Sequence, residues 1–196
     1  KDYDFESVYF NEDYTPYAKK RDEEIENWCI SENIECHKIH DYLLAPIGTF
    51  LKKDETYYGV YGPFRKITKG FKIDKPKNYK FDKKNFMKIK SPCKLTDLDS
   101  YYTKNENLLI NGGRSRALKV LTNVDKFSSY DTNRDILDYN TTHLSAYIKY
   151  GNLSIREVYH AFYNKYGEDF GIIGQLFWRE FYFYIVYYTP KVLEEG

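Results

Sequence analysis

The chain has 196 residues, a formal net charge of +1 and 42% hydrophobic residues. This is enough apolar material for one ordinary domain or two small ones, which excludes a disordered chain. No apolar run approaches the roughly 20 residues that a membrane-spanning helix needs, so we expect no contact with a membrane. Nothing at the start resembles a signal peptide, and the sequence therefore predicts an intracellular protein, cytoplasmic or nuclear.

The three cysteines, Cys29, Cys36 and Cys93, are an odd number whose spacing fits no disulfide scaffold, which suits a reducing compartment. Zinc could be imagined between Cys29, Cys36, His37 and His40, but the usual short Cys-x-x-Cys pairing is absent. We therefore expect no metal site. Aromatic residues make up 19% of the chain, and most of the 22 Tyr and 13 Phe are expected in the core.

The N-terminal part has the pattern of an α/β domain. Residues 7–10 predict a strand, Thr15-Pro16 begins a helix that runs to about Cys29, and residues 34–39 predict a second strand. The strand-helix-strand order favours a parallel, right-handed unit. The helix is expected to pack on the sheet through Ala18, Ile25, Trp28 and Cys29. Two strands are too few to bury both faces, so residues 1–72 are interpreted as the C-terminal portion of an incomplete, Rossmann-like domain.

A linker is expected to follow this domain. Residues 57–64 are aromatic and Gly-punctuated, which predicts irregular structure before another short helix. Over residues 73–108 the hydrophobic periodicity is lost. Pro, Lys and Asn are frequent from about Ile73 to Asp97. Residues 64–94 hold twelve Lys or Arg against only Asp74 and Asp82. This basic charge could follow DNA or simply keep the linker hydrated, and we favour hydration.

The pattern becomes helical over residues 109–196. Helices are expected to begin after Gly112-Gly113 and to cover residues 144–150, 155–166 and 172–188. Gly151 suits the end of one helix, and Ser154 with Glu157 forms a Ser-x-x-Glu capping box that begins the next. The sequence therefore predicts an α/β part followed by an all-α part.

A hydroxyl cluster lies at the start of the helix over residues 144–150. Thr141, Thr142 and Ser145 stand where free backbone N–H groups favour an anion, which is typical of a phosphate site. An ordinary helix cap is the alternative. Tyr130 could close over a cofactor and Arg134 could reach a phosphate, and the alternative is that both are ordinary surface residues.

The last helix carries a polar and aromatic stripe. Gln175, Trp178, Arg179 and Tyr182 share one face at i, i+3, i+4 and i+7. Buried Arg and Gln are costly without partners, so this stripe suits a pocket wall beside nucleic acid better than a core. Glu180 is expected to form a salt bridge with Arg156 or another helix. The apolar face is expected to pack inward through Ile173, Leu176, Phe177 and Tyr184.

At these residues the sequence resembles the photolyase and cryptochrome family of flavoproteins. Five blocks match in order along nearly the whole chain: residues 9–17 with Arg21-Asp22, residues 61–64, Gly112-Gly113 with Ala117-Leu118, residues 141–145 continuing into 150–154, and residues 175–181. The resemblance implies an α/β antenna domain, a long linker and a helical FAD domain. Residues 1–72 are expected to be the C-terminal portion of the antenna domain, and residues 109–196 the N-terminal portion of the FAD domain.

The resemblance also implies roles for individual residues. FAD is expected to be held by Tyr130, Thr141, Thr142, His143, Leu144 and Ser145. The DNA is expected to lie near Arg134, Gln175, Trp178, Arg179 and Tyr182. Two positions depart from the common pattern: Gln175 stands where Glu is frequent, which leaves the lesion type open, and His143 replaces a frequent Arg. No catalytic residue is assigned within this chain.

The activity implied by the resemblance is that of a deoxyribodipyrimidine photolyase. Reduced FAD absorbs blue light and gives an electron to a pyrimidine dimer, which splits in DNA. An antenna chromophore, a folate or a deazaflavin, is a further cofactor of such proteins. We expect the chain to be part of a longer monomeric protein and to hold FAD weakly on its own. The alternatives are a cryptochrome light receptor without repair activity, or a non-enzymatic nucleic-acid-binding protein.

Overall fold

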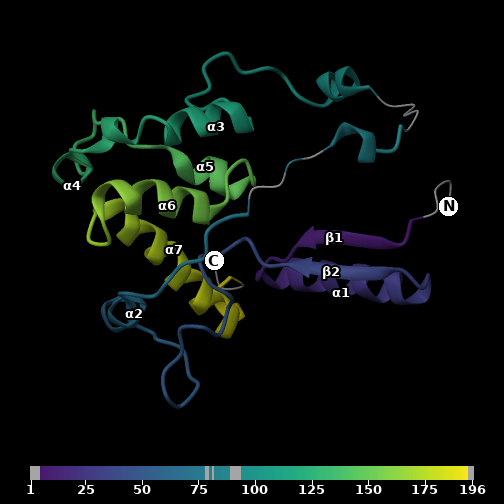
Figure 1. Cartoon of the computed structure of the whole chain (residues 1–196), viewed down its shortest axis with the longest axis horizontal. Coiled ribbons are helices and arrows are strands. Elements are labelled where there is room, and N and C mark those ends of the chain that lie inside the picture. The colour runs from purple at the N-terminus through teal and green to yellow at the C-terminus, as the bar shows by residue number, and fades with distance from the viewer. Residues whose placement is uncertain (1–4, 78–79, 81, 89–93, 194–196) are drawn as a thin grey trace.

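A computed structural model describes residues 5–77, 80, 82–88 and 94–193 (Figure 1). Cys93, named above, lies outside these residues. The α/β part contains strand β1 (Ser7–Asn11), helix α1 (Pro16–Ser31) and strand β2 (Glu35–Ile39). The other α-helices are α2 (Tyr61–Thr68), α3 (Arg114–Leu121), α4 (Tyr130–Asn133), α5 (Leu144–Lys149), α6 (Ile155–Tyr166) and α7 (Gly171–Tyr188). Short 3-10 helices cover Lys83–Asn85, Leu95–Tyr101, Val124–Phe127 and Pro190–Leu193.

The α/β part is a strand-helix-strand unit, as the sequence predicted. Strand β1 pairs in parallel with β2, with Ser7 opposite Glu35 and Asn11 opposite Ile39. Helix α1 begins where expected, because the Thr15 side chain accepts a hydrogen bond from the backbone N–H of Ala18 at 3.3 Å. The helix lies along one face of the two-stranded sheet (Figure 1), and Lys19 Nζ on it is 3.5 Å from the ring centroid of Tyr187 on α7. The expected fold class is thereby confirmed.

The packing face of α1 is narrower than predicted. Ala18 and Cys29 are buried, but the prediction was wrong for Trp28, which is 46% exposed. Its ring centroid lies 6.3 Å from that of Phe5. The buried neighbour on the helix is polar: Asp22 accepts a hydrogen bond from Arg21 Nε at 2.8 Å. A sheet of two strands offers too little width to cover an indole at the edge of the helix.

Helix α2 begins earlier than the sequence indicated. Residues 57–64 were expected to be irregular, but the helix begins at Tyr61 and includes Pro63 in its first turn. Proline is tolerated there because the first N–H groups of a helix have no intrahelical acceptor. The consequence is that Phe64, already in the helix, is fully buried between α2 and α7.

The helical part follows the sequence pattern closely. The capping box of α6 forms, since the Ser154 backbone N–H donates to Glu157 Oε2 at 2.9 Å and Ser154 Oγ accepts from Arg156 N. Gly151 follows α5 with φ of 65°, and Gly113 precedes α3 with φ of 114°, both left-handed values that favour glycine. Among the residues described, no helix is both long and apolar enough to cross a membrane.

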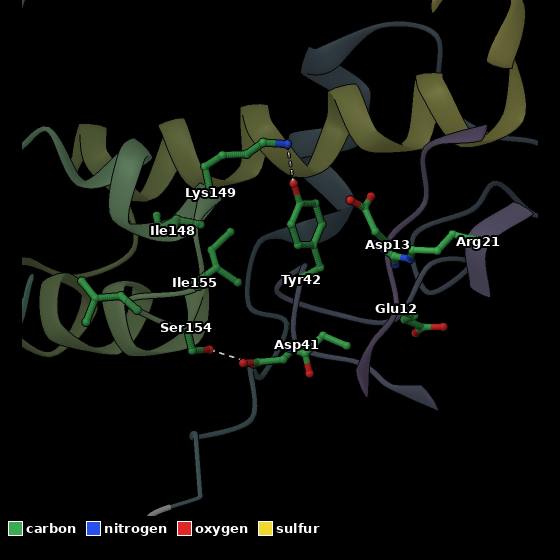
Figure 2. Close-up of a pocket in the computed structure, with 12 residues that line it drawn as sticks. Glu12, Asp13, Arg21, Asp41, Tyr42, Ile148, Lys149, Ser154 and Ile155 are labelled. Carbon is green, nitrogen blue, oxygen red and sulfur yellow. Dashed lines mark hydrogen bonds between the residues drawn. The ribbon is translucent and has the colours of Figure 1, made fainter. Parts of the chain in front are cut away.

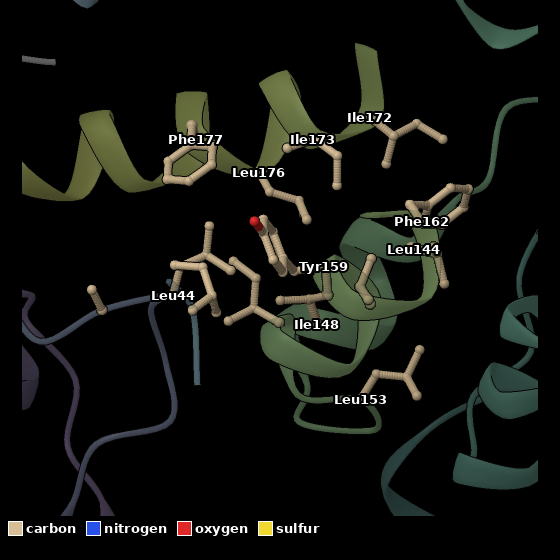
Figure 3. Packing of buried hydrophobic residues seen from close by; sticks show 14 of the residues in the cluster. Leu44, Leu144, Ile148, Leu153, Tyr159, Phe162, Ile172, Ile173, Leu176 and Phe177 are labelled. Carbon is tan, nitrogen blue, oxygen red and sulfur yellow. The ribbon is translucent and has the colours of Figure 1, made fainter. Parts of the chain in front are cut away.

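The hydrophobic core lies between α5, α6 and α7. The predicted inward face of α7 is confirmed, because Ile173, Leu176, Phe177 and Tyr184 are all buried. Figure 3 shows Ile173 and Leu176 pointing from α7 toward Tyr159 and Ile148 on the facing helices. Leu44 also enters this core, from the segment that follows β2. The segment between the α/β unit and α2 is therefore anchored on α7.

Candidate functional site

A cavity of about 320 Å³ lies between the turn before α5 and the first half of α7. Tyr130 of α4 and residues 141–145 line it on one side, and Gln175 and Arg179 of α7 line it on the other. Its apolar wall consists of Leu144, Ile148, Val158, Ile172 and Leu176. The structure thus brings together all six residues predicted for the cofactor and two of the five predicted for DNA.

The turn before α5 has an unusual backbone at His143. Its φ is 51°, a left-handed value that disfavours residues with a Cβ, and such strain clusters at functional sites. The Thr142 hydroxyl accepts a hydrogen bond from the Leu144 backbone N–H at 3.3 Å. His143 Nε2 is buried and finds no hydrogen-bond partner among the described residues. A buried nitrogen of this kind is costly unless a ligand satisfies it.

Arg179 is held from three sides. Its guanidinium carbon lies 4.5 Å from the ring centroid of Tyr42 and 4.8 Å from that of Phe183. Nη1 donates to the backbone carbonyl of Tyr42 at 2.7 Å. Burial lowers the pKa of Arg179, although an arginine stays charged in proteins. Nη2 is buried without a partner in the described part of the chain, and other atoms of Arg179 line the cavity.

The predicted stripe of α7 divides between two surroundings. Gln175 is exposed at the cavity, whereas Trp178 and Tyr182 are not among the residues that line it. The indole of Trp178 instead stacks on Tyr61 of α2, with ring centroids 3.6 Å apart and an interplanar angle of 11°. Arg134 is exposed, lies outside the cavity lining, and its Nε is 3.8 Å from Asp135 Oδ2.

Glu180 does not bind Arg156, and that expectation was wrong. Its carboxylate is fully buried and accepts hydrogen bonds from the backbone N–H groups of Leu44 at 3.0 Å and Ala45 at 3.1 Å. Arg156 instead binds Asp41, with Nε 3.1 Å from Oδ1. Burial raises the pKa of Glu180 to about 7, against the two backbone donors and Arg179, which lower it. Glu180 is thus part of the anchor for the segment after β2.

A second cavity, of about 240 Å³, lies where the α/β unit meets the turn between α5 and α6 (Figure 2). Ser154 Oγ donates to Asp41 Oδ1 at 2.8 Å, and Lys149 Nζ donates to the Tyr42 hydroxyl at 3.3 Å. Ile148 lines both cavities. Tyr42 lines the second cavity, and its backbone carbonyl accepts a hydrogen bond from Arg179, which lines the first cavity.

Three residues of the site were missed from the sequence. Tyr42 and Phe183 hold Arg179, and Tyr61 stacks on Trp178. Phe183 lies one turn beyond Arg179 on α7, so helical periodicity was the available signal for it. Tyr42 and Tyr61 come from segments without periodicity. Among the described residues, no cluster of three or more His, Cys, Asp or Glu is arranged to hold a metal ion.

The fold and the cavity define a class of protein: an α/β unit followed by a helical part whose cavity offers hydroxyls, an imidazole and a guanidinium to a ligand. Comparison with known proteins shows what the chain is similar to. The family model described as DNA photolyase matches residues 1–80. The deoxyribodipyrimidine photo-lyase of Alkalihalophilus pseudofirmus is 29% identical to this chain, over 95% of the chain and 41% of its own length.

Solved structures agree with this result. The archaeal photolyase from Sulfolobus tokodaii, described with two FAD molecules, superposes with a TM-score of 0.71 and is 31% identical, over 95% of this chain and 40% of its own. The class III photolyase from Agrobacterium tumefaciens has a TM-score of 0.75 at 22% identity, over 95% and 42%, and supports the fold alone. The resemblance to the photolyase and cryptochrome family is confirmed, and the chain spans about 40% of the length of the relatives it matches.

Proposed function

We propose that this chain provides part of the FAD site and the adjoining DNA surface of a light-driven photolyase that repairs pyrimidine dimers. The observation that carries the proposal is the convergence of residues 141–145 with Gln175 and Arg179 on one cavity. These elements are some thirty residues apart in the sequence. An ordinary helix cap gives no reason for an arginine of a distant helix to line the same cavity.

The chemistry of the cavity fits a cofactor that carries phosphates and an aromatic ring. Thr141, Thr142 and Ser145 supply hydroxyls, and His143 Nε2 and Arg179 Nη2 supply two buried nitrogens that lack partners in the described structure. Hydrogen bonds to charged groups are stronger than neutral ones, so Arg179 is well placed for an anionic group. We therefore assign Arg179 to the cofactor rather than to the DNA, where the sequence had placed it.

The size of the cavity suits part of a dinucleotide. Its 320 Å³ lies near the lower end of the roughly 300–1,000 Å³ of small-molecule sites. FAD, with two ring systems and a pyrophosphate, belongs toward the upper end. When bound and reduced, FAD would supply under blue light the electron that splits a pyrimidine dimer. The residues of this chain would hold the cofactor and present Gln175, Trp178 and Tyr182 to the DNA beside it.

FAD binding is tested by titrating the purified chain with FAD and following flavin fluorescence. Ser145→Ala removes a hydroxyl from the cavity, and Ser128→Ala removes one from an exposed turn outside it. We expect weaker FAD binding for Ser145→Ala and unchanged binding for Ser128→Ala. Equal affinity of both variants and the parent would contradict the assignment of this cavity to FAD.

Repair is tested by irradiating dimer-containing DNA with blue light in the presence of the complete, FAD-loaded parent protein, because this chain spans only about 40% of the length of its relatives. Loss of dimers in the light but not in the dark supports a photolyase. FAD binding without repair favours the cryptochrome alternative. Binding of DNA that weakens with salt but ignores both light and lesions favours a non-enzymatic nucleic-acid-binding protein.

A further inference from the structure

The aromatic stack between α2 and α7 has a geometry that an ordinary core does not need. Tyr61 and Trp178 lie almost parallel, with centroids 3.6 Å apart, whereas Phe64 meets Phe181 at a tilted 53°. The Tyr61 hydroxyl also donates to the Gly174 backbone carbonyl at 2.9 Å. One ring therefore covers a face of the indole and is hydrogen-bonded to the turn of α7 that carries Gln175.

Tyr61 is itself held in place by the packing of α2. Phe64, one turn further along α2, is fully buried. The Arg65 guanidinium lies 4.6 Å from the ring centroid of Phe177, and Arg65 Nη2 donates to the Glu168 carbonyl at 3.1 Å. Helix α2 is thus fixed to α7 and to the turn before it. The orientation of the Tyr61 ring is set before any ligand arrives.

Trp178 is half-buried and has an exposed aromatic neighbour on α7. Tyr182 is 58% exposed, and its ring centroid lies 5.7 Å from that of Trp178 at an interplanar angle of 27°. Gln175, one turn before Trp178 on α7, is exposed as well. Together Gln175, Trp178 and Tyr182 form a surface that combines an amide with two aromatic rings, which suits the edge and the flat face of a nucleobase.

We propose that Tyr61 is a positioning residue for DNA: it fixes the Trp178 ring so that a nucleobase of the damaged strand stacks beside Tyr182. The inference rests on the proposed function. Base stacking on an aromatic side chain requires a flat surface in a defined orientation. Tyr61 sets that orientation by covering one face of the indole, together with the edge-on contact of Phe181 at 82°. Fixing the ring beforehand removes an entropic cost of binding.

The size of the effect follows from the strength of aromatic pairs. Such pairs contribute, beyond buried area, an amount that corresponds to about a two- to twelvefold change in an equilibrium constant. We expect Tyr61→Leu to weaken binding of a short duplex with one thymine dimer by that factor. Tyr61→Phe keeps the ring, loses only the bond to Gly174, and is expected to restore the affinity to within about twofold of the parent.

The experiment uses the full chain with Trp28→Phe, because Trp28 and Trp178 are the only tryptophans in the sequence. Trp178 fluorescence then reports on this ring alone. Dimer DNA is expected to quench it in the parent and in Tyr61→Phe, and to quench it less in Tyr61→Leu. The matched control is Tyr58→Leu, which removes a ring that contacts Phe64 from the same segment.

Each outcome decides one question. A parent that does not distinguish dimer DNA from the undamaged duplex overturns the proposed function, and this inference with it. A parent that does so, while Tyr61→Leu and Tyr58→Leu have equal affinity and equal quenching, overturns the role of Tyr61 alone. Should Tyr61→Leu lose its native circular dichroism, Tyr61→Met, which keeps more of the volume but has no ring, takes its place under the same criteria.

Discussion

Two polar regions that both depend on α7 differ in how fully their hydrogen-bonding groups are satisfied. In the anchor that holds residues 42–50, Glu180 accepts from Leu44 and Ala45, and the Tyr184 hydroxyl accepts from the Phe50 backbone N–H at 2.9 Å. In the cavity, His143 Nε2 and Arg179 Nη2 are buried without partners in the described structure.

This difference separates a structural role from a binding role. Buried polar groups in proteins are nearly always hydrogen-bonded, because leaving one unpaired costs about 1–3 kcal/mol. The anchor obeys this rule, and we interpret it as a device that fixes the segment after β2 to the helical part. His143 Nε2 and Arg179 Nη2 do not obey it, and neither do His40 Nε2 and the Tyr139 hydroxyl outside the cavity lining, so the proposal of a ligand rests on the residues that converge on the cavity.

The strongest test of the anchor is Glu180→Ala. The substitution leaves the backbone N–H groups of Leu44 and Ala45 buried without an acceptor and opens a void at a fully buried position. We expect the free energy of unfolding to fall by about 3–5 kcal/mol. Urea denaturation followed by circular dichroism measures it. Glu106→Ala, at an exposed position, is the control and should change stability by less than about 0.5 kcal/mol.

The pH dependence of stability sharpens the same point. Burial raises the pKa of Glu180 from 4.5 to about 7, so the folded state binds a proton that the unfolded state has already released between these values. Stability from this group is present below about pH 4.5 and is lost as pH rises through about 7, by at most about 3 kcal/mol. Urea midpoints across this range measure the loss, and Glu180→Gln, which cannot titrate, should remove this component of the pH profile.

Local signals in the sequence predicted most of the helices and strands. The caps at Thr15 and Ser154 depend on neighbouring residues only, and they form as expected. The inward face of α7 follows from helical periodicity. The sequence predicted a cofactor site at residues 141–145 and a pocket wall on α7, and the structure places residues from both on one cavity. The roles of these residues stay predictions.

What the sequence could not provide were contacts set by irregular segments. The partners of Glu180 are backbone groups of residues 44 and 45, and no side-chain pattern reveals a backbone acceptor or donor. Tyr61 reaches Trp178 only because α2 begins three residues before Phe64. The four residues of the α7 stripe do not share one environment, because α2 packs on Trp178 through Tyr61 while Arg179 lines the cavity.

Arg179→Met tests the interpretation of the cavity. The variant loses two ring contacts and the bond to the Tyr42 carbonyl, but it also removes a buried charge, so we expect stability to change by no more than about 1 kcal/mol. FAD affinity should fall by about tenfold or more, since a charge-assisted hydrogen bond is lost. Fluorescence titration and urea denaturation measure the two effects. A large loss of stability with unchanged affinity would place Arg179 in the anchor instead.

The smallest effect is expected at His143. Its φ of 51° costs roughly 1–2 kcal/mol for a residue with a Cβ, and glycine removes this strain while adding entropy to the unfolded chain. His143→Gly should therefore leave the free energy of unfolding within about 1 kcal/mol of the parent, or slightly raise it. FAD binding should weaken, because the buried Nε2 donor or acceptor is lost. The control is Asn33→Gly. Asn33 also has a positive φ but lies outside the cavity lining, so this substitution relieves a similar strain without changing the ligand site. His160→Gly would not serve, because His160 lies within α6. If both variants bind FAD as the parent does, the left-handed turn at His143 serves only to begin α5.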